Sequence, residues 1–282
     1  MFASVALASR IDAAEVDLTL QAGRLIGGHD TLAVEIAGGA AVSTARGSPF
    51  DKVIGLGFAP FEDAALSAFV AFEEAVLARG GVVQVELSSL ADPSVARALA
   101  RRGYTLVGFE NVLGFDLGSA AARRAEAADT PGVAVTRAAP EELDTWIDVV
   151  ATGFAHPDVG DGPESHESFS RETVERAMRD MLEVTGFSCY LARREGRTAG
   201  GASMRLDPPR RVAQLTGAAT LPAERRHGVQ SALLRARLAL AAAAGAEIAV
   251  ITTRPGSKSQ ENAMKGGFAL LYVRGVLLKP AP

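Results

Sequence analysis

An internal repeat constrains the fold of this chain more than any other feature of its sequence. Gly103-Tyr104 and Gly267-Phe268 stand in the same local pattern, which sets an offset of 164 residues (268 minus 104). Residues 83–113 (VQVELSSLADPSVARALARRGYTLVGFENVL) then lie without a gap over residues 247–277 (EIAVITTRPGSKSQENAMKGGFALLYVRGVL). Both halves read as strand, helix, strand, short helix, strand. Two copies of one α+β unit explain the pattern; the alternative is generic similarity between alanine-rich helices.

Composition narrows the class of protein. Of the 282 residues, 48% are hydrophobic, which is enough for a sizeable core. Lys and Arg (29) nearly balance Asp and Glu (33), so the net charge of −4 argues against a nucleic-acid surface. Cys189 is the single cysteine, which excludes an internal disulfide and a cysteine-rich metal site. With no signal peptide or membrane-spanning stretch in the pattern, we expect a cytoplasmic protein without a bound metal or a membrane partner.

A second feature, residues 216–240, reads as a strand, a basic turn and an amphipathic helix. The helix carries apolar residues at helical spacing, at Val229, Leu233, Ala236 and Leu240. A helix N-terminus presents unpaired backbone N–H groups and a positive dipole end, and Gly228 lets a ligand approach the backbone. These properties suit a pyrophosphate. The alternative is an ordinary strand–helix connection with solvated arginines.

The first copy of the repeat differs at this turn. At the offset of 164, Glu62, Asp63 and Ala64 correspond to residues 226–228. Two carboxylates and an added Cβ would repel a pyrophosphate both electrostatically and sterically. We therefore predict that only the second copy binds such a ligand.

The second half resembles the GNAT superfamily of acyl-CoA-dependent N-acetyltransferases. The resemblance rests on residues 218–222 (AATLP), Arg225-x-x-Gly228-x-Gln230 with the following SALL, and a short helix closed by Gly267-Phe268. It covers residues 133–280, and residues 52–117 are similar to the later part of a degenerate GNAT unit. Gln230 departs from the family pattern, which has Gly or Ala at that position.

The resemblance implies an α+β fold of two GNAT-like (acyl-CoA N-acyltransferase) lobes, each a mixed, mostly antiparallel sheet flanked by helices. The predicted division is a degenerate N-terminal lobe at residues 1–118, a linker at 119–132 and an acetyltransferase domain at 133–282. The linker is predicted because residues 119–131 (SAAARRAEAADTP) lack large apolar side chains.

The resemblance also implies acetyl-CoA as the co-substrate. Its pantetheine arm would pair with the backbone of the strand that ends at Thr220, and its pyrophosphate would lie on the amides of the turn. The cofactor-binding residues implied are Ala218, Ala219, Thr220, Arg225, Arg226, His227, Gly228, Val229, Gln230 and Ser231.

The residues at the positions of the family's general acid and general base differ from those of most members. Many members have a Tyr near the leaving thiolate at the position of Ala263. Asn262 and Ser259 share one face of the short helix and are the candidates to hydrogen-bond the thiol; the alternative is helix capping by Ser257 or Ser259, with Asn262 solvated. Where many members have a strand Glu, this strand offers Gln214 and Thr216.

These features predict transfer of an acetyl group from acetyl-CoA to the primary amine of an unidentified small molecule or peptide, by direct attack. The alternative is a non-catalytic acyl-CoA-binding or scaffold protein, because both the Tyr and the strand Glu are missing. No nucleic-acid partner is expected. The sequence leaves the amine, the acyl-chain preference and the oligomeric state open, a homodimer included.

Overall fold

The computed structural model describes residues 2–44, 47–118, 130–156 and 169–280. Spatial proximity along the chain divides them into two compact units. The N-terminal unit contains residues 2–44, 47–111, 169–184 and 271–280. The C-terminal unit contains residues 112–118, 130–156 and 185–270. Each unit therefore includes at least one segment from the opposite half of the sequence.

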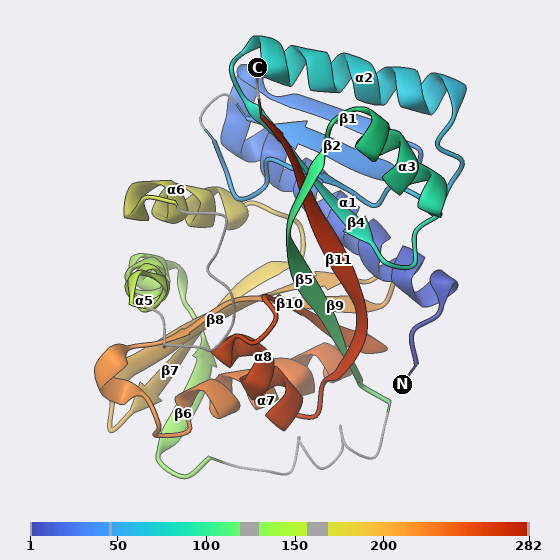
Figure 1. Ribbon diagram of the computed structural model, residues 1–282. Coiled ribbons are helices and arrows are strands. Elements are labelled where there is room, and N and C mark those ends of the chain that lie inside the picture. The colour runs from blue at the N-terminus through green and yellow to red at the C-terminus, as the bar shows by residue number, and fades with distance from the viewer. Residues whose placement is uncertain (1, 45–46, 119–129, 157–168, 281–282) are drawn as a thin grey trace. The chain divides into compact units, whose positions relative to one another are not determined.

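The N-terminal unit is a mixed sheet with helices on both faces (Figure 1). Its strands, in spatial order, are β1 (Leu32–Ile36), β2 (Gly39–Ser43), β3 (Val53–Ile54), β4 (Val82–Ser88) and β11 (Ala269–Pro280). Its helices are α1 (Val5–Gly27), α2 (Asp63–Ala78), α3 (Pro93–Arg101) and α6 (Arg171–Met181), with a short 3-10 turn, η1 (Gly28–Asp30). The pair β3–β4 is parallel, and the other three pairs are antiparallel.

Alternation along β2 and β3 assigns the two faces of this sheet. Ala41 and Val53 pack in the core under α2 and α3. Val42 and Ile54, one residue further along each strand, pack against α1 instead. Successive side chains of a strand point to opposite faces, so α1 and α2 cover opposite sides of the sheet. Helix α6 packs on α1.

The C-terminal unit repeats this plan. Its strands, in spatial order, are β10 (Ile248–Thr253), β9 (Val212–Thr220), β8 (Arg197–Asp207), β7 (Phe187–Arg194) and β6 (Val133–Arg137). Its helices are α5 (Leu143–Ala155), α7 (Val229–Ala243) and α8 (Lys258–Lys265), with two 3-10 turns, η2 (Pro140–Glu142) and η3 (Pro222–Glu224). Again one pair, β9–β10, is parallel and the other three are antiparallel.

Two neighbouring glycines of β8 show how closely helices approach this second sheet. A Cβ on Gly200 would lie 2.8 Å from Val229 of α7, whereas a Cβ on Gly201 would lie 2.9 Å from Val150 of α5. The two helices thus cover opposite faces, and each reaches the backbone of the sheet. The predicted mixed, mostly antiparallel sheets flanked by helices are confirmed in both units.

The structure also confirms the repeat. Strand β5 (Thr105–Asp116) and strand β11 begin and end 164 residues apart, and α3 and α8 agree with this offset to within one residue. The equivalent strands nevertheless end in opposite units, β5 in the C-terminal unit and β11 in the N-terminal unit. In the N-terminal unit β4 pairs with β11, from Arg274↔Ser88 to Pro280↔Val82. In the C-terminal unit the end of β5 takes part, because the Leu117 amide donates to Glu247 O (2.9 Å).

The predicted domain boundaries, 1–118 and 133–282 with a linker between them, stay a prediction. Most of the predicted linker, residues 119–129, lies outside the described residues. In the part of the chain that the structure describes, no helix is long and apolar enough to cross a membrane.

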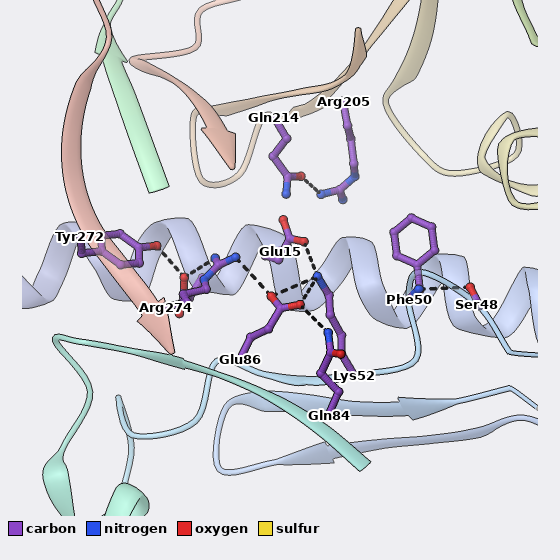
Figure 2. A network of polar contacts seen from close by, with 11 residues as sticks. Glu15, Ser48, Phe50, Lys52, Gln84, Glu86, Arg205, Gln214, Tyr272 and Arg274 are labelled. Atoms are coloured by element: carbon purple, nitrogen blue, oxygen red, sulfur yellow. Dashed lines mark hydrogen bonds and ion pairs between the residues drawn. The ribbon is translucent and has the colours of Figure 1, made fainter. Parts of the chain in front are cut away.

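A buried ionic network lies inside the N-terminal unit (Figure 2). Arg274, about 1% exposed, donates to Asp12 Oδ1 (2.6 Å) and approaches Glu86 (3.6 Å). Lys52 pairs with the same Glu86 (3.1 Å) and with Glu15 (3.2 Å). Burial favours the neutral form of a lysine, but the carboxylates outweigh it, and the pKa of Lys52 rises. The network joins α1, β4 and β11 through buried charges.

We expect Arg274→Met to lower the free energy of unfolding by about 3–5 kcal/mol, because Asp12 loses the buried cation at 2.6 Å and Glu86 keeps only Lys52 of its two cations. Chemical denaturation measures this loss. Arg79→Met is the control, since Arg79 is exposed and its partner among the described residues is a backbone oxygen, Asp30 O. Removing both charges in Asp12→Leu/Arg274→Met should restore much of the stability. Equal losses in Arg274→Met and Arg79→Met would contradict the prediction.

Candidate active site

The candidate site begins where two parallel strands of the C-terminal unit separate. Strand β10 pairs with β9 only from Ile248↔Val212 to Val250↔Gln214. Beyond this point β9 continues to Thr220 and β10 to Thr253 without pairing to each other. Residues 215–220 therefore lose the neighbour that would occupy their backbone groups on this edge. An edge of this kind can pair with an extended ligand.

A β-bulge lies on the other side of the same segment. The ladder between β8 and β9 runs from Ser203↔Thr216 directly to Gly201↔Ala219, so β9 has one extra residue here. Gly217 makes the bulge with a φ of 54°, and a Cβ at this position would lie 2.6 Å from Ser203 Oγ. Positive φ and the close hydroxyl both require glycine. The bulge bends β9 where it separates from β10.

Two buried hydroxyls lie at the ends of these strands. Thr220 is the last residue of β9, and Thr253 is the last residue of β10. The Oγ1 atom of each is buried without a hydrogen-bond partner among the described residues. A buried hydroxyl without a partner is unfavourable by about 1–3 kcal/mol. Such atoms suit a polar ligand that would supply the missing bonds.

The turn that follows β9 leads into the N-terminus of α7. Gly228 is the N-cap with a φ of 79°, and its carbonyl accepts the first helical bond, from the Ala232 amide (2.9 Å). Arg226 has a φ of 65°, a conformation that is unfavourable by about 1–2 kcal/mol for a residue with a side chain. The amides of Val229, Gln230 and Ser231 lie in the first turn, where no intrahelical partner exists.

The basic residues of this turn divide into two groups. Arg226 and His227 are exposed beside the N-cap. Arg225 is partly buried, and its guanidinium donates to the backbone oxygen of His156. Arg225 thus joins the turn to the end of α5. Nearby, Arg194 donates to Glu224 (2.7 Å) and holds the pKa of that carboxyl below its usual range.

Helix α8 carries the candidate acid. Ser257 is its N-cap and accepts from the Gln260 amide (3.2 Å), so the capping role belongs to Ser257 and not to Ser259. Ser259 is exposed and Asn262 is partly buried; neither side chain has a partner within the described residues. Ala263 is 2% exposed and packs in the core. Its position therefore faces the interior of the unit.

The two candidates for a strand base are held by neighbours in the sheet. Gln214 Oε1 accepts from Arg205 (2.9 Å), and both side chains are buried. The Thr216 hydroxyl pairs with the Ser203 hydroxyl (2.9 Å). Neither amide nor hydroxyl is a base near neutral pH.

Helix α7 differs from its sequence-based description at two positions. Leu240, expected on the apolar stripe, is 45% exposed, and Arg237 is buried instead with 1% exposed. The buried face follows Val229, Leu233, Arg237 and Ala241, at i, i+4, i+8 and i+12. The sequence pattern could not predict a buried charge on this face, because arginine is normally a surface residue.

The other candidate residues either lie away from this site or fall outside the residues that the structure describes. Burial raises the pKa of the Cys189 thiol to about 12, so the thiol is not ionised near neutral pH and lacks the thiolate that a catalytic cysteine needs. The resemblance to the GNAT superfamily implies that the polar loop at residues 156–168 faces the acceptor, but residues 157–168 lie outside the described residues. Among the residues that are described, no group of three or more His, Cys, Asp or Glu side chains is arranged around a metal position.

Together these elements fit a ligand with an extended polar arm and an anionic end. The unpaired edge of β9 and the two hydroxyls suit amide groups of the arm. The N-terminus of α7, with Gly228 at the cap, suits phosphate oxygens. A strand edge and a helix N-terminus joined by one short turn can hold both parts of an acyl-CoA.

Comparison with known proteins agrees with this arrangement. The family model described as "Acetyltransferase (GNAT) family" matches residues 158–268. No curated protein matches the chain in sequence. Among solved structures, a GCN5-related N-acetyltransferase from Kribbella flavida has a TM-score of 0.64 at 18% identity, covering 96% of both chains.

Two further structures share the fold. A tandem GNAT protein from the clavulanic acid biosynthesis pathway has a TM-score of 0.63 at 14% identity, covering 96% of this chain and 95% of its own. A GCN5-related N-acetyltransferase from Sphaerobacter thermophilus has a TM-score of 0.56 at 14% identity, covering 78% and 70%. Residues 158–268 are therefore a domain of the GNAT acetyltransferase family, in a chain whose fold is GNAT-like over nearly its whole length.

Proposed function

We propose that the C-terminal unit transfers an acetyl group from acetyl-CoA to the primary amine of a small molecule or peptide. The observation that carries the proposal is the separation of β9 from β10 immediately before the N-terminus of α7. In this proposal the backbone of Ala218, Ala219 and Thr220 holds the pantetheine arm, and residues 225–231 hold the pyrophosphate.

In the proposed reaction acetyl-CoA supplies the acyl group and the leaving thiol. The protein contributes alignment, because a bound amine and a bound thioester react as if at very high local concentration. It also contributes backbone N–H donors from the bulged part of β9, which would stabilise the oxyanion of the tetrahedral intermediate. Because Gln214 and Thr216 cannot act as bases, the amine would attack the thioester carbonyl in its neutral form. Its proton would then pass to water, and the C–S bond would break to release the thiolate of CoA.

Release of free thiol tests the proposal. Acetyl-CoA is mixed with a panel of small-molecule and peptide amines, and the thiol is followed with a colorimetric disulfide reagent. The single cysteine is 4% exposed and its thiol is not ionised near neutral pH, so the protein itself should add little background. Amine-dependent thiol release with a matching acetylated product is expected. Binding of acetyl-CoA without release with any amine would favour the alternative, a non-catalytic acyl-CoA-binding protein.

Asn262 and Ser259 are the proposed partners of the leaving thiolate. Asn262→Ala and Ser259→Ala should each lower kcat more than acetyl-CoA affinity, because the interaction strengthens as the thiolate forms. Steady-state kinetics and calorimetry measure the two quantities. Ser257→Ala is the control: losing the cap of α8 should lower stability by about 1 kcal/mol. A loss confined to KM in either Asn262→Ala or Ser259→Ala would assign that residue to binding instead.

A further inference from the structure

Arg237 is a charged side chain in an otherwise apolar face of α7. It is 1% exposed, and no carboxylate lies within ion-pair distance of it among the described residues. Burial lowers the pKa of its guanidinium to about 10, so the side chain still carries its charge near neutral pH. Burying a charge without a counter-charge is unfavourable. Leucine or methionine would fill the position at no such cost.

The acceptors of Arg237 indicate what the charge does. Its Nε donates to Leu233 O (3.1 Å), one turn earlier on α7. One terminal nitrogen donates to Ser203 O (2.8 Å) and to Thr216 O (3.2 Å). All three are backbone carbonyls, from α7, β8 and β9 respectively. A single planar side chain thus joins the helix to both strands.

The two strand carbonyls mark one particular place in the ladder. Ser203 and Thr216 are partners, and theirs is the last pair before the bulge at Gly217. The Thr216 carbonyl belongs to the same peptide unit as the Gly217 N–H. A charge-assisted hydrogen bond to this carbonyl polarises the unit and strengthens its N–H as a donor. Arg237 therefore acts on the backbone at the start of the bulged segment.

We propose that Arg237 is a positioning residue for acyl transfer, which fixes the bulge of β9 relative to the N-terminus of α7. This inference rests on the proposed function. The bulge would hold the acyl end of the substrate and the helix N-terminus its phosphate end, so the distance between them decides where the thioester carbonyl lies. Oxyanion donors act only when held within about 0.5 Å of the productive geometry. Through its guanidinium, Arg237 links the strand at the start of the bulge to helix α7, whose N-terminus would bind the phosphates.

The test compares Arg237→Met, Arg237→Lys and a control on the same helix, Arg235→Met. Partly buried Arg235 reaches Thr130 outside the sheet. Arg237→Met should lower kcat by about 10- to 100-fold, within the range seen when a preorganised donor is lost, with KM for acetyl-CoA changed less than about threefold. Arg237→Lys keeps the charge but not the planar fork, so it should recover part of kcat. Arg235→Met should leave kcat unchanged.

Amide hydrogen exchange in the free protein gives a readout that needs no activity. Peptides covering residues 201–205 and 214–219 should exchange at least about tenfold faster in Arg237→Met than in Arg235→Met, since local opening becomes easier without the bridge. Should Arg237→Met fail to fold, Arg237→Lys carries the same comparison.

The outcomes separate the two proposals. Unchanged exchange in these peptides, or a loss in KM alone, would overturn the role of Arg237 even if the wild type transfers acetyl groups. If the wild type transfers none to any amine, the proposed function fails, and faster exchange in Arg237→Met still supports Arg237 as the residue that fixes the bulge.

Discussion

Gly228→Glu is expected to abolish acetyl-CoA binding while the chain stays folded. The residue caps α7 with a φ of 79°, and a carboxylate here would face the phosphate oxygens that the helix N-terminus is proposed to bind. In the wild type, acetyl-CoA at a hundredfold excess over Kd should stabilise the folded state by about 2.7 kcal/mol. A thermal-shift titration should show this rise in melting temperature for the wild type and none for Gly228→Glu.

Gly228→Ala adds a Cβ without a carboxylate, so it separates the steric effect of a side chain at this position from the effect of its charge. Its Cβ would lie 3.0 Å from Thr130 Cγ2, and the positive φ is unfavourable for alanine by about 1–2 kcal/mol. It should therefore melt at a lower temperature than the wild type but keep measurable acetyl-CoA binding. Calorimetry on the wild type should give one acetyl-CoA per chain, because Glu62 and Asp63 stand at the equivalent turn of the first copy. A ligand response in Gly228→Glu equal to that of the wild type would place the cofactor elsewhere.

Residues 133–282 expressed alone are expected not to give a soluble, folded protein. In the full chain residues 274–280 of β11 pair with β4, which this fragment lacks. Arg274 would also lose Asp12 and Glu86. In the C-terminal unit the ring of Phe268 contacts Phe115 (5.4 Å between centroids), a residue from the first half. The fragment would expose an unpaired strand and apolar core residues, which favour aggregation.

Co-expression with residues 1–132 is the matched test. This second fragment supplies β4, the end of β5 and the buried carboxylates, so the two fragments together should recover soluble protein that melts cooperatively. Size-exclusion chromatography and thermal melting measure both states. A monodisperse, cooperatively melting 133–282 fragment would show that the second half folds without these contributions.

The turn at Gly228 shows how much of the local structure can be predicted from the pattern of neighbouring residues. A strand, Pro222, a glycine and an amphipathic run were sufficient to predict a helix that begins beside that glycine, and α7 begins at Val229. Propensity and capping act over a few neighbouring residues, so sequence alone could place this end. The same holds between β7 and β8, where Glu195-Gly196 between two apolar segments predicts a hairpin and both residues have a positive φ. The cofactor contacts of the turn remain a prediction.

Local pattern was less informative where burial depends on distant partners. The apolar residues at 53–58 (VIGLGF) predict a buried strand over the whole segment, but β3 contains only Val53 and Ile54. The expected stripe of α7 included Leu240, whereas the buried position is Arg237. Carbonyls from two strands bind that guanidinium, and nothing within the helix sequence indicates that they are near. The bulge at Gly217 likewise depends on the register of β8 against β9.

The sequence by itself determined the repeat, its offset of 164 residues and the α+β character of both copies, because these follow from local periodicity and turn residues. Only the tertiary structure decided that β4 pairs with β11 rather than with its own following strand. The two equivalent strands have similar apolar patterns and the same length, so pattern cannot choose between them. The choice depends on contacts across more than two hundred residues of chain, such as that of Arg274 with Asp12, and such contacts exist only once the chain has folded.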